Sequence, residues 1–392
     1  MKGMLYLVWR YLIYHWIKTV LLTASITLIL FLPSGLRVLI QQSRSQLAAR
    51  AESTPLVVGA RGSPLELVLN TCYFSSKVPE LMSYGHVEEM AKTEQALPIP
   101  LYVRFHAQDN PIVGTTLDYF DFRGLQVQTG RQLSRLGDCV VGAQLANRQG
   151  IKPGDTLISS PEKVFDFAGV YPLKMKVTGI LAFSDTPDDD AIFVDIKTAW
   201  IIEGRAHGHE DLTQSEAAPR VLKRQDNVLI GNASVVEYTE ITDKNINSFH
   251  FHGDPATFQI TSILAVPHDH KSKTLLIGHY KTDPKTPYQI LEPETVLNEL
   301  LGTILTIERF VITALVMVGV STLVIAALVF MLSLRLRKRE IQTMAMIGGS
   351  RLTVTFILIS EIVFVLLTSA VLATGLTIVA GCYAADVIRT FL

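Results

Sequence analysis

Three long apolar runs dominate the hydrophobic pattern, one near the start of the chain and two near its end. They span residues 19–36, 310–334 and 352–381, and Glu361 is the one charged residue inside them. An α-helix rises about 1.5 Å per residue, so roughly 20 residues cross a hydrocarbon core of about 30 Å. Each run is long enough, and the pattern predicts transmembrane helices over 19–40, 310–334 and 352–381.

The segment before the first run has an amphipathic pattern. Its apolar and basic residues alternate: Lys2, Leu5, Trp9, Arg10, Leu12, Trp16 and Lys18. This is typical of an interfacial helix, here over 1–18. The first run is longer than the apolar region of a signal peptide, and no small-x-small cleavage site follows it directly. We therefore expect an uncleaved membrane anchor.

Basic residues between the second and third runs set the predicted topology. The short loop carries Arg335, Arg337, Lys338, Arg339 and Arg351, opposed only by Glu340. Because Lys and Arg concentrate in cytoplasmic loops, this loop is expected in the cytoplasm. Three spans then put the N-terminus in the cytoplasm, and they put the central block and a tail over 382–392 on the far side.

The central block, 41–291, alternates two kinds of pattern. Runs rich in β-branched residues and bounded by Gly, Pro or Asp predict strands at 56–59, 99–105, 111–115, 173–181 and 191–195. Helical patterns lie between them at 64–71, where Ser63 and Pro64 suit a helix start, and at 142–149. The prediction is a membrane protein with three transmembrane α-helices and a large α+β extracytoplasmic domain between the first and second spans.

Three further segments have distinct patterns. Residues 185–190 read as a turn, and the polar stretch from His207 to about Asp226 as a mobile loop. A helical pattern over 292–305 leads into the second run and predicts a stalk helix over 292–309.

Composition and missing motifs narrow the function. The net charge is −1, so nothing indicates nucleic-acid binding. The mean hydropathy of +0.31 is high for a soluble protein. The sequence contains no Gly-Lys dipeptide, hence no P-loop, and no G-x-S-x-G or H-E-x-x-H motif. An enzyme is not expected, and any ATP and Mg²⁺ would be bound by another subunit. Cys72 and Cys139 fall in the extracytoplasmic block, where a disulfide between them is permitted.

Residues 335–351, called the coupling segment below, have a helical pattern of their own. Ile341, Met344 and Ala345 follow helical spacing, and Gly348-Gly349 suits a helix stop. On pattern alone, an ordinary basic loop is an equal alternative.

The run R-L-R-K-R-E-I-Q-T-M-A-M-I-G-G-S-R resembles the coupling segment of MacB/FtsX-type ABC transporter permeases, the group that includes the lipoprotein-releasing permeases. Residues 130–133, 140–146, 150–157 and 175–181 are similar to that family's periplasmic-domain pattern. The resemblance implies that a separate ATPase docks on Arg337, Lys338, Arg339, Glu340, Ile341, Met344, Ala345, Gly348 and Gly349. Typical members have four spans, so this chain resembles a three-span variant.

Glu361 also falls where that family often has a glutamate. It lies ten residues beyond Arg351, roughly 15 Å along a helix and so within the membrane. Intramembrane carboxylates are costly and usually face protein or water. One hypothesis is a proton or substrate relay, and the other is a helix contact or a pairing with a basic residue near the cytoplasmic leaflet.

Six of the ten histidines form three His-x-His pairs: His207/His209, His250/His252 and His268/His270. Residues i and i+2 of a strand share a face, which suits metal ligation by imidazole. The pattern predicts a zinc site or, alternatively, solvated loop histidines.

The resemblance implies the permease subunit of an ABC transporter in the bacterial inner membrane, with a large periplasmic domain. Two copies in the lipid bilayer would pair with two ATPase subunits and transmit ATP-driven motion to the periplasmic side. A periplasmic binding or adaptor protein is a further expected partner. The alternatives are a permease linked to zinc acquisition through the His-x-His region, and a regulator of an envelope hydrolase.

Overall fold

The computed structural model divides into two compact units, which we call the helical unit and the domain. The helical unit comprises Met1–Leu47 and Glu299–Leu392, and the domain comprises Ala48–Asn298. The structure describes residues 6, 9–10, 12–14, 16–75, 77–160, 172–207, 221–225, 228–231, 239–243, 245–282, 286–336, 342–343, 346 and 351–391.

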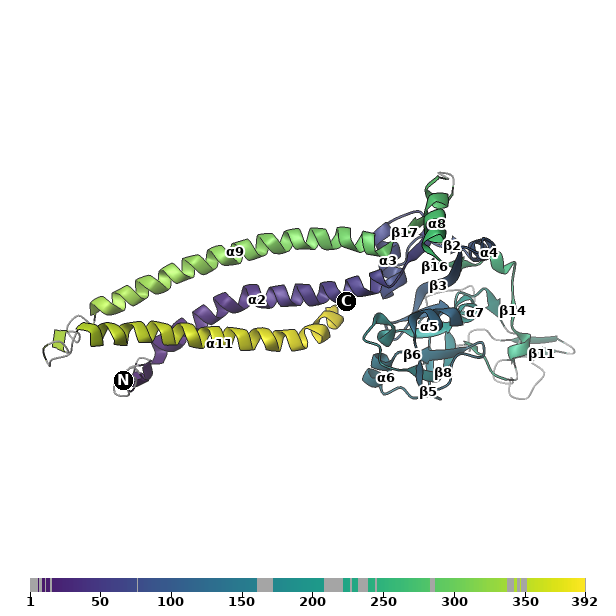
Figure 1. Ribbon diagram of the computed structural model, residues 1–392. Helices are drawn as coiled ribbons and strands as arrows, with labels where there is room; N and C mark the ends of the chain where they lie inside the picture. The colour runs from purple at the N-terminus through teal and green to yellow at the C-terminus, as the bar shows by residue number, and fades with distance from the viewer. Residues whose placement is uncertain are drawn as a thin grey trace. The chain divides into compact units, whose positions relative to one another are not determined.

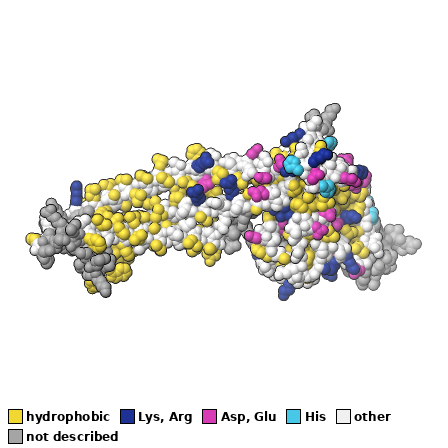
Figure 2. All heavy atoms as spheres, in the orientation of Figure 1, with side chains coloured by type: hydrophobic (Ala, Val, Ile, Leu, Met, Phe, Trp, Pro, Cys, Tyr) yellow, Lys and Arg dark blue, Asp and Glu magenta, His cyan; other side chains and the backbone are white. Residues whose placement is uncertain are grey.

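The helical unit consists mainly of three long helices: α2 (Trp16–Glu52), α9 (Pro293–Leu336) and α11 (Arg351–Phe391). The last residues of α2 and the first residues of α9 belong to the domain. Among the described residues, these three are long and apolar enough to cross a membrane. They run side by side in Figure 1, and hydrophobic side chains cover them in Figure 2, whereas charged side chains and histidines gather over the domain. Large exposed apolar side chains along α9 and α11 are the surface that hydrocarbon would cover.

The three helices keep a constant register. The Lys18 amine contacts Glu361 and, sixteen residues further along both helices, Ser34 bonds Thr377. This fixes α2 and α11 as parallel. Lys18 also lies over the Phe330 ring of α9. Eleven residues further along α2, Ile29 packs against Gly319, which lies eleven residues before Phe330 in α9. α9 is therefore antiparallel to α2.

The domain is built on one mixed sheet of eleven strands. Its main path runs β13-β8-β6-β9-β4-β3-β16-β1-β17, and β5 and β7 pair with β8. The strands are β1 (Leu56–Ala60), β3 (Ala96–Ala107), β4 (Asn110–Thr115), β5 (Val127–Gly130), β6 (Asp138–Val141), β7 (Thr156–Ile158), β8 (Leu173–Leu181), β9 (Ile192–Asp195), β13 (Thr239–Glu240), β16 (Ser262–Pro267) and β17 (Tyr288–Leu291).

Short strand pairs lie outside this sheet. They are β2 (Met82–Ser83) with β15 (Gln259–Ile260), β10 (Ala206–His207) with β14 (His250–Phe251), and β11 (Val221–Gln225) with β12 (Val228–Gly231). Three 3₁₀ turns are described: η1 (Pro187–Asp190), η4 (Ile246–Ser248) and η5 (Pro255–Thr257).

Alternate side chains of the strands enter two separate cores. In β9, Ile192 and Val194 belong to one cluster and Phe193 to the other. The first cluster takes residues from α4 (Gly85–Lys92), α6 (Ala143–Gln149), α7 (Ile196–Ile202) and α8 (His270–Thr282). The second takes Phe74, which ends α3 (Pro64–Tyr73), and residues of α5 (Leu117–Arg123). Helices on both faces of a sheet are the α+β arrangement that the sequence predicts.

All five predicted strands and both predicted helices are confirmed within a few residues. Ser63 begins α3 by accepting a hydrogen bond from the Glu66 amide, with Pro64 as the first helical residue. The turn at 185–190 contains η1. The mobile loop predicted from His207 to about Asp226 is wrong near its end, because Val221–Gln225 form β11 and pair with β12. Residues 208–220 lie outside the described residues.

The sequence pattern underestimates β3, which begins at Ala96 and not at 99. Pro98 and Pro100 obscure its first half. There β3 pairs with β16, while its pairing with β4 begins only at Tyr102. Proline has no N–H to donate to a strand pairing. It is tolerated here because β4 does not pair with this half of β3.

Gly142 joins β6 to α6 where backbone from η1 leaves no room for a side chain. A Cβ at this position would lie 2.3 Å from the Asp189 carbonyl oxygen and 2.4 Å from that of Asp188. Gly142→Ala should therefore destabilise the protein by about 1–3 kcal/mol, because the obstructing atoms are backbone. The measurement is the thermal midpoint of the detergent-purified chain.

Gly278→Ala in α8 is the matched control, since nothing lies within 4 Å of a Cβ there. This change should be neutral or stabilising by up to about 1 kcal/mol. Equal midpoints for the two variants would contradict the close approach of η1 to Gly142.

Candidate functional site

The nine residues expected to dock an ATPase all lie outside the described residues. The structure describes what surrounds them: α9 ends at Leu336, and α11 begins at Arg351. Within the segment, Gln342, Thr343 and Met346 are helical, and the Met346 side chain is 80% exposed. The coupling role of 335–351 stays a prediction.

Glu361 forms an ion pair with Lys18 inside the helical unit. The Lys18 Nζ lies 3.0 Å from Glu361 Oε1, and the two side chains are 20% and 5% exposed. The same amine lies 5.1 Å from the centre of the Phe330 ring, a cation–π contact. One cation therefore joins α2, α9 and α11 at a single level. Sequence reasoning had assigned Lys18 to the interfacial segment 1–18 and had not named it as the partner of Glu361.

Polar contacts continue along the α2–α11 seam beyond this pair. Ser369 Oγ donates to the Thr23 carbonyl at 3.2 Å, and the Ser34 and Thr377 hydroxyls lie 3.0 Å apart. On α11, Glu361, Val365, Ser369 and Ala373 are buried, at a spacing of four residues. This spacing forms one helix face. Small and hydroxyl side chains on that face allow close approach, and each hydrogen bond contributes about 0.6 kcal/mol in a membrane.

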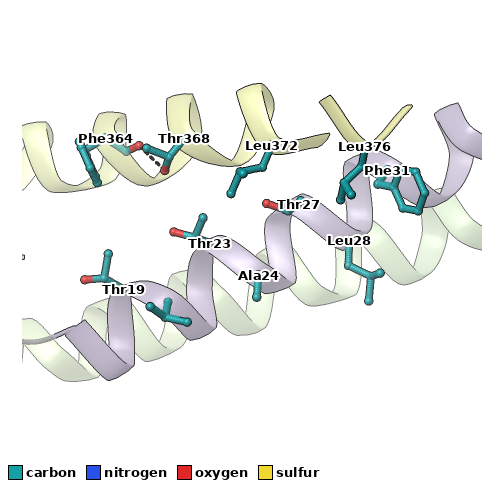
Figure 3. A pocket seen from close by; sticks show the side chains of 11 residues that line it. Thr19, Thr23, Ala24, Thr27, Leu28, Phe31, Phe364, Thr368, Leu372 and Leu376 are labelled. Carbon is teal, nitrogen blue, oxygen red and sulfur yellow. Dashed lines mark hydrogen bonds between the residues drawn. The ribbon is translucent and has the colours of Figure 1, made fainter. Parts of the chain in front are cut away.

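An open groove of about 550 Å³ lies between α2 and α11. Figure 3 shows Thr19, Thr23 and Thr27 of α2 opposite Phe364, Thr368 and Leu372 of α11. None of the described residues that line the groove is charged. The Thr368 hydroxyl donates to the Phe364 carbonyl of its own helix. Such a lining accommodates hydrocarbon.

One histidine from each of two His-x-His pairs lies in the strand pair β10–β14. The register sets His207 directly opposite His250. The rings of His250 and His252 lie 4.6 Å apart. His268 follows β16, His270 begins α8, and His209 is not described. Among the described residues, no group of three or more His, Cys, Asp or Glu side chains is arranged to hold a metal ion.

A buried charge cluster at the C-terminal end of α2 was not identified from the sequence. The Arg50 guanidinium donates to both carboxylate oxygens of Asp188, at 2.7 and 2.9 Å, and to the Tyr119 hydroxyl at 2.7 Å. Arg50, Asp188 and Tyr119 are 6%, 1% and 0% exposed. Burial raises the pKa of the Tyr119 hydroxyl well above its usual value, so it remains a proton donor.

Cys72 and Cys139 are free and buried, so the permitted disulfide is absent. Burial raises the pKa of both thiols, which keeps them protonated and unreactive at neutral pH. Cys72 lies beside the Arg50 cluster, and its carbonyl accepts a hydrogen bond from Arg50 Nε at 3.1 Å.

These features define a class: a protein with apolar helices long enough to span a membrane and an α+β domain built on a mixed sheet. Residues 20–222 match the MacB-like periplasmic core domain family, which covers just over half of the chain. The chain belongs to this family and is a MacB/FtsX-type ABC transporter permease. Membership implies an ABC ATPase partner and fits a bacterial inner-membrane protein.

Solved structures with distant similarity include three domains of this kind. The periplasmic region of MacB from Actinobacillus actinomycetemcomitans is 12% identical, with 63% of this chain and 92% of that chain covered and a TM-score of 0.34. The extracellular domain of YknZ, a noncanonic ABC-type transporter from Gram-positive bacteria, is 11% identical, with 60% and 98% covered and a TM-score of 0.31. A domain of a putative permease from Porphyromonas gingivalis is 13% identical, with 62% and 91% covered and a TM-score of 0.28. No curated protein matched the chain.

The Lys18–Glu361 pair generates a test of how the helices are held together. Lys18→Met leaves the Glu361 carboxylate, 5% exposed, without its amine partner. Removing one member of a buried pair costs about 3–5 kcal/mol, and the partial exposure of Lys18 favours the lower end. The thermal midpoint of the detergent-purified chain should fall accordingly.

The double variant Lys18→Met/Glu361→Leu removes both charges and should recover most of this loss. Glu361→Leu alone also removes one member of the pair, but the assembled protein should keep its transport activity if the carboxylate only pairs with Lys18. A relay role for Glu361 would instead require Glu361→Leu to lose transport activity while keeping normal assembly.

Proposed function

We propose that this permease subunit transmits ATP-driven motion of a separate ATPase to its periplasmic domain, and that it does not conduct a substrate through a pore. The observation that carries the proposal is the continuity of α9. This one helix runs from Pro293 to Leu336 and ends at the coupling segment. At about 1.5 Å per residue its 44 residues span roughly 66 Å.

The other end of α9 is attached to the central sheet. Only Glu292 separates α9 from β17, and β17 pairs with β1 over four residues. α2 ends at Glu52, and three residues separate it from β1, which begins at Leu56. Two of the long helices are thus connected to neighbouring strands of one sheet. Displacement of either helix along its axis would apply force to the same strand pair, β1–β17.

The helices themselves favour transmitted motion over conduction. The two grooves found in the helical unit are lined mainly by apolar side chains and hydroxyls, with Lys18 the only charged residue among those linings. Lys18 is paired with Glu361. A route for a polar substrate would need groups that replace its water, and these linings supply few.

We propose three spans for each copy, with 335–351 in the cytoplasm and the domain in the periplasm. The functional unit would be a homodimer with two ATPase subunits, and a periplasmic binding or adaptor protein is a further candidate partner. Only 6% of the 18-residue apolar stretch of α9 is buried within one chain, so a second copy or lipid must cover it.

Charge reversal in the coupling segment tests the docking of the ATPase. Arg337→Glu with Arg339→Glu should weaken binding of the ATPase at least about tenfold, because like-charge contacts cost several kcal/mol and 1.4 kcal/mol is a factor of ten. Met344→Pro should have a similar effect by breaking the helical segment. Co-purification of the ATPase from membranes is the measurement.

The control carries charge reversals at Lys152 and Lys197, two exposed residues of the domain. All variants should insert in the membrane at the wild-type level. Normal ATPase recovery with the Arg337/Arg339 variant would refute docking at this segment.

Zinc binding is a second candidate function, favoured by the register of His207 opposite His250 and by the neighbouring ring of His252. Equilibrium dialysis of the purified chain should then detect zinc at micromolar concentration, and a His250→Ala/His252→Ala variant should lose it. His279→Ala, in the last turn of α8, is the control and should bind normally. No bound zinc at micromolar concentration would end this proposal.

A further inference from the structure

The end of α2 is fixed in the domain by one side chain with an unusually complete set of partners. Arg50 Nη1 and Nη2 bind the two oxygens of Asp188, Nη2 also donates to the Tyr119 hydroxyl, and Nε donates to the Cys72 carbonyl. The Tyr119 hydroxyl in turn donates to Asp188 Oδ1 at 2.7 Å. We call Arg50, Asp188 and Tyr119 the Arg50 clamp.

The clamp partners come from parts of the domain that are distant in the sheet. Cys72 belongs to α3, which follows β1. Tyr119 belongs to α5, which follows β4, and Asp188 belongs to η1, which precedes β9. In the sheet, β9 and β4 lie near the middle of the strand order, whereas β1 lies next to the β17 edge. Arg50 therefore links the edge at which α2 enters to the central strands.

The turn that holds Asp188 is itself firmly built. Thr186 and Asp189 form a capping box around η1, and the Thr186 hydroxyl donates to Asp188 Oδ2 at 2.9 Å. The Asp189 carboxylate accepts hydrogen bonds from the Ser184 amide at 3.0 and 3.2 Å. Because its carboxylate is held by its own turn, Asp188 is a fixed point for Arg50 and not a flexible counter-ion.

A second arginine secures the chain just beyond α2. Arg123 donates to the Ser53 hydroxyl at 3.1 Å and to the Thr54 hydroxyl at 2.7 Å. The Thr54 hydroxyl donates to the Arg50 carbonyl at 2.8 Å. Cations and donors at a helix C-terminus are favoured by its free carbonyls and dipole. α5 thus contacts the end of α2 through both Tyr119 and Arg123.

A buried ion pair is weak evidence for stability, since the loss of hydration of both charges offsets much of the attraction. What a bidentate arginine–carboxylate pair supplies is fixed geometry. We propose that the Arg50 clamp is the positioning contact that passes displacement of α2 to η1 and β9, in addition to the covalent route into β1. This inference rests on the proposed function, because it assumes that α2 moves with ATP.

The test uses the full chain in complex with the ATPase that co-purifies with it. Hydrogen–deuterium exchange is measured by mass spectrometry with and without ATP and vanadate. In the wild type, ATP should change exchange in two regions: the β1–β17 strand pair, and η1 with β9. In the double variant Arg50→Met/Asp188→Leu, the change at β1–β17 should persist and the change at η1 and β9 should be lost.

The double variant is chosen because replacing a buried ion pair with apolar residues of similar volume is often neutral or stabilising. Asp188→Asn is the second variant: it keeps the shape of the side chain but removes its charge, and it should reduce the η1–β9 response. Arg148→Met is the matched control, since Arg148 pairs with Asp190 of the same turn but is 54% exposed. It should leave both responses unchanged.

The outcomes separate the two proposals. An unchanged η1–β9 response in both clamp variants would overturn the role of the clamp and leave mechanical transmission intact. A wild-type response confined to β1–β17 would also overturn it. No ATP-dependent change in either region of the wild type would overturn the proposed function, and with it this inference.

Discussion

The pairing of buried charges from distant parts of the chain is the constraint on which this structure depends. Among the described residues, each unit contains such a pair. Lys18 and Glu361 meet among the apolar helices, and Arg50 and Asp188 meet within the domain. An unpaired charge at either place would cost several kcal/mol, so the helix register and the position of η1 are both restricted by the need to keep the pairs together. The two pairs also involve the same helix, because Lys18 lies near one end of α2 and Arg50 near the other.

The two ion pairs differ in how much movement of α2 they allow. Arg50 is bound by fixed groups through each of its guanidinium nitrogens, so a rotation of α2 at that end would break several hydrogen bonds at once. The Lys18 amine contacts one carboxylate oxygen and the face of Phe330. A lysine on a flexible stem can follow its partner over some distance, whereas a bidentate arginine cannot. The structure thus combines a fixed contact in the domain with an adaptable contact among the helices.

Local features of the fold were predictable from the sequence, and long-range pairings were not. Ser63 and Pro64 predict the start of α3 because N-capping is a local interaction, and the alternation of apolar and polar residues in 173–181 predicts β8. Glu361 stood out because a carboxylate is rare in an apolar run. The sequence pattern does not identify its partner, since Lys18 is 343 positions away. Arg50 looked like one of several charges after the first span, and Asp188 like a turn residue. Only the sheet order brings them together, and no pattern in the sequence encodes that order.

The sharing of contacts among the three helices suggests two mechanical routes with different requirements. α9 reaches β17 through an unbroken backbone, so its route needs no side-chain contact with its neighbours. α2 is not joined directly to the coupling segment, so in the proposed mechanism it responds through its contacts with α11 and α9. Among the described residues, those contacts include Lys18 with Glu361 and Phe330, the Ser34–Thr377 hydroxyl pair, and the Ser369 hydroxyl that donates to the Thr23 carbonyl. Because α2 and α9 enter neighbouring strands, unequal movement of the two helices would shear β1 against β17. The Arg50 clamp ties α2 to strands further into the sheet, and this spreads the shear beyond one pair of strands.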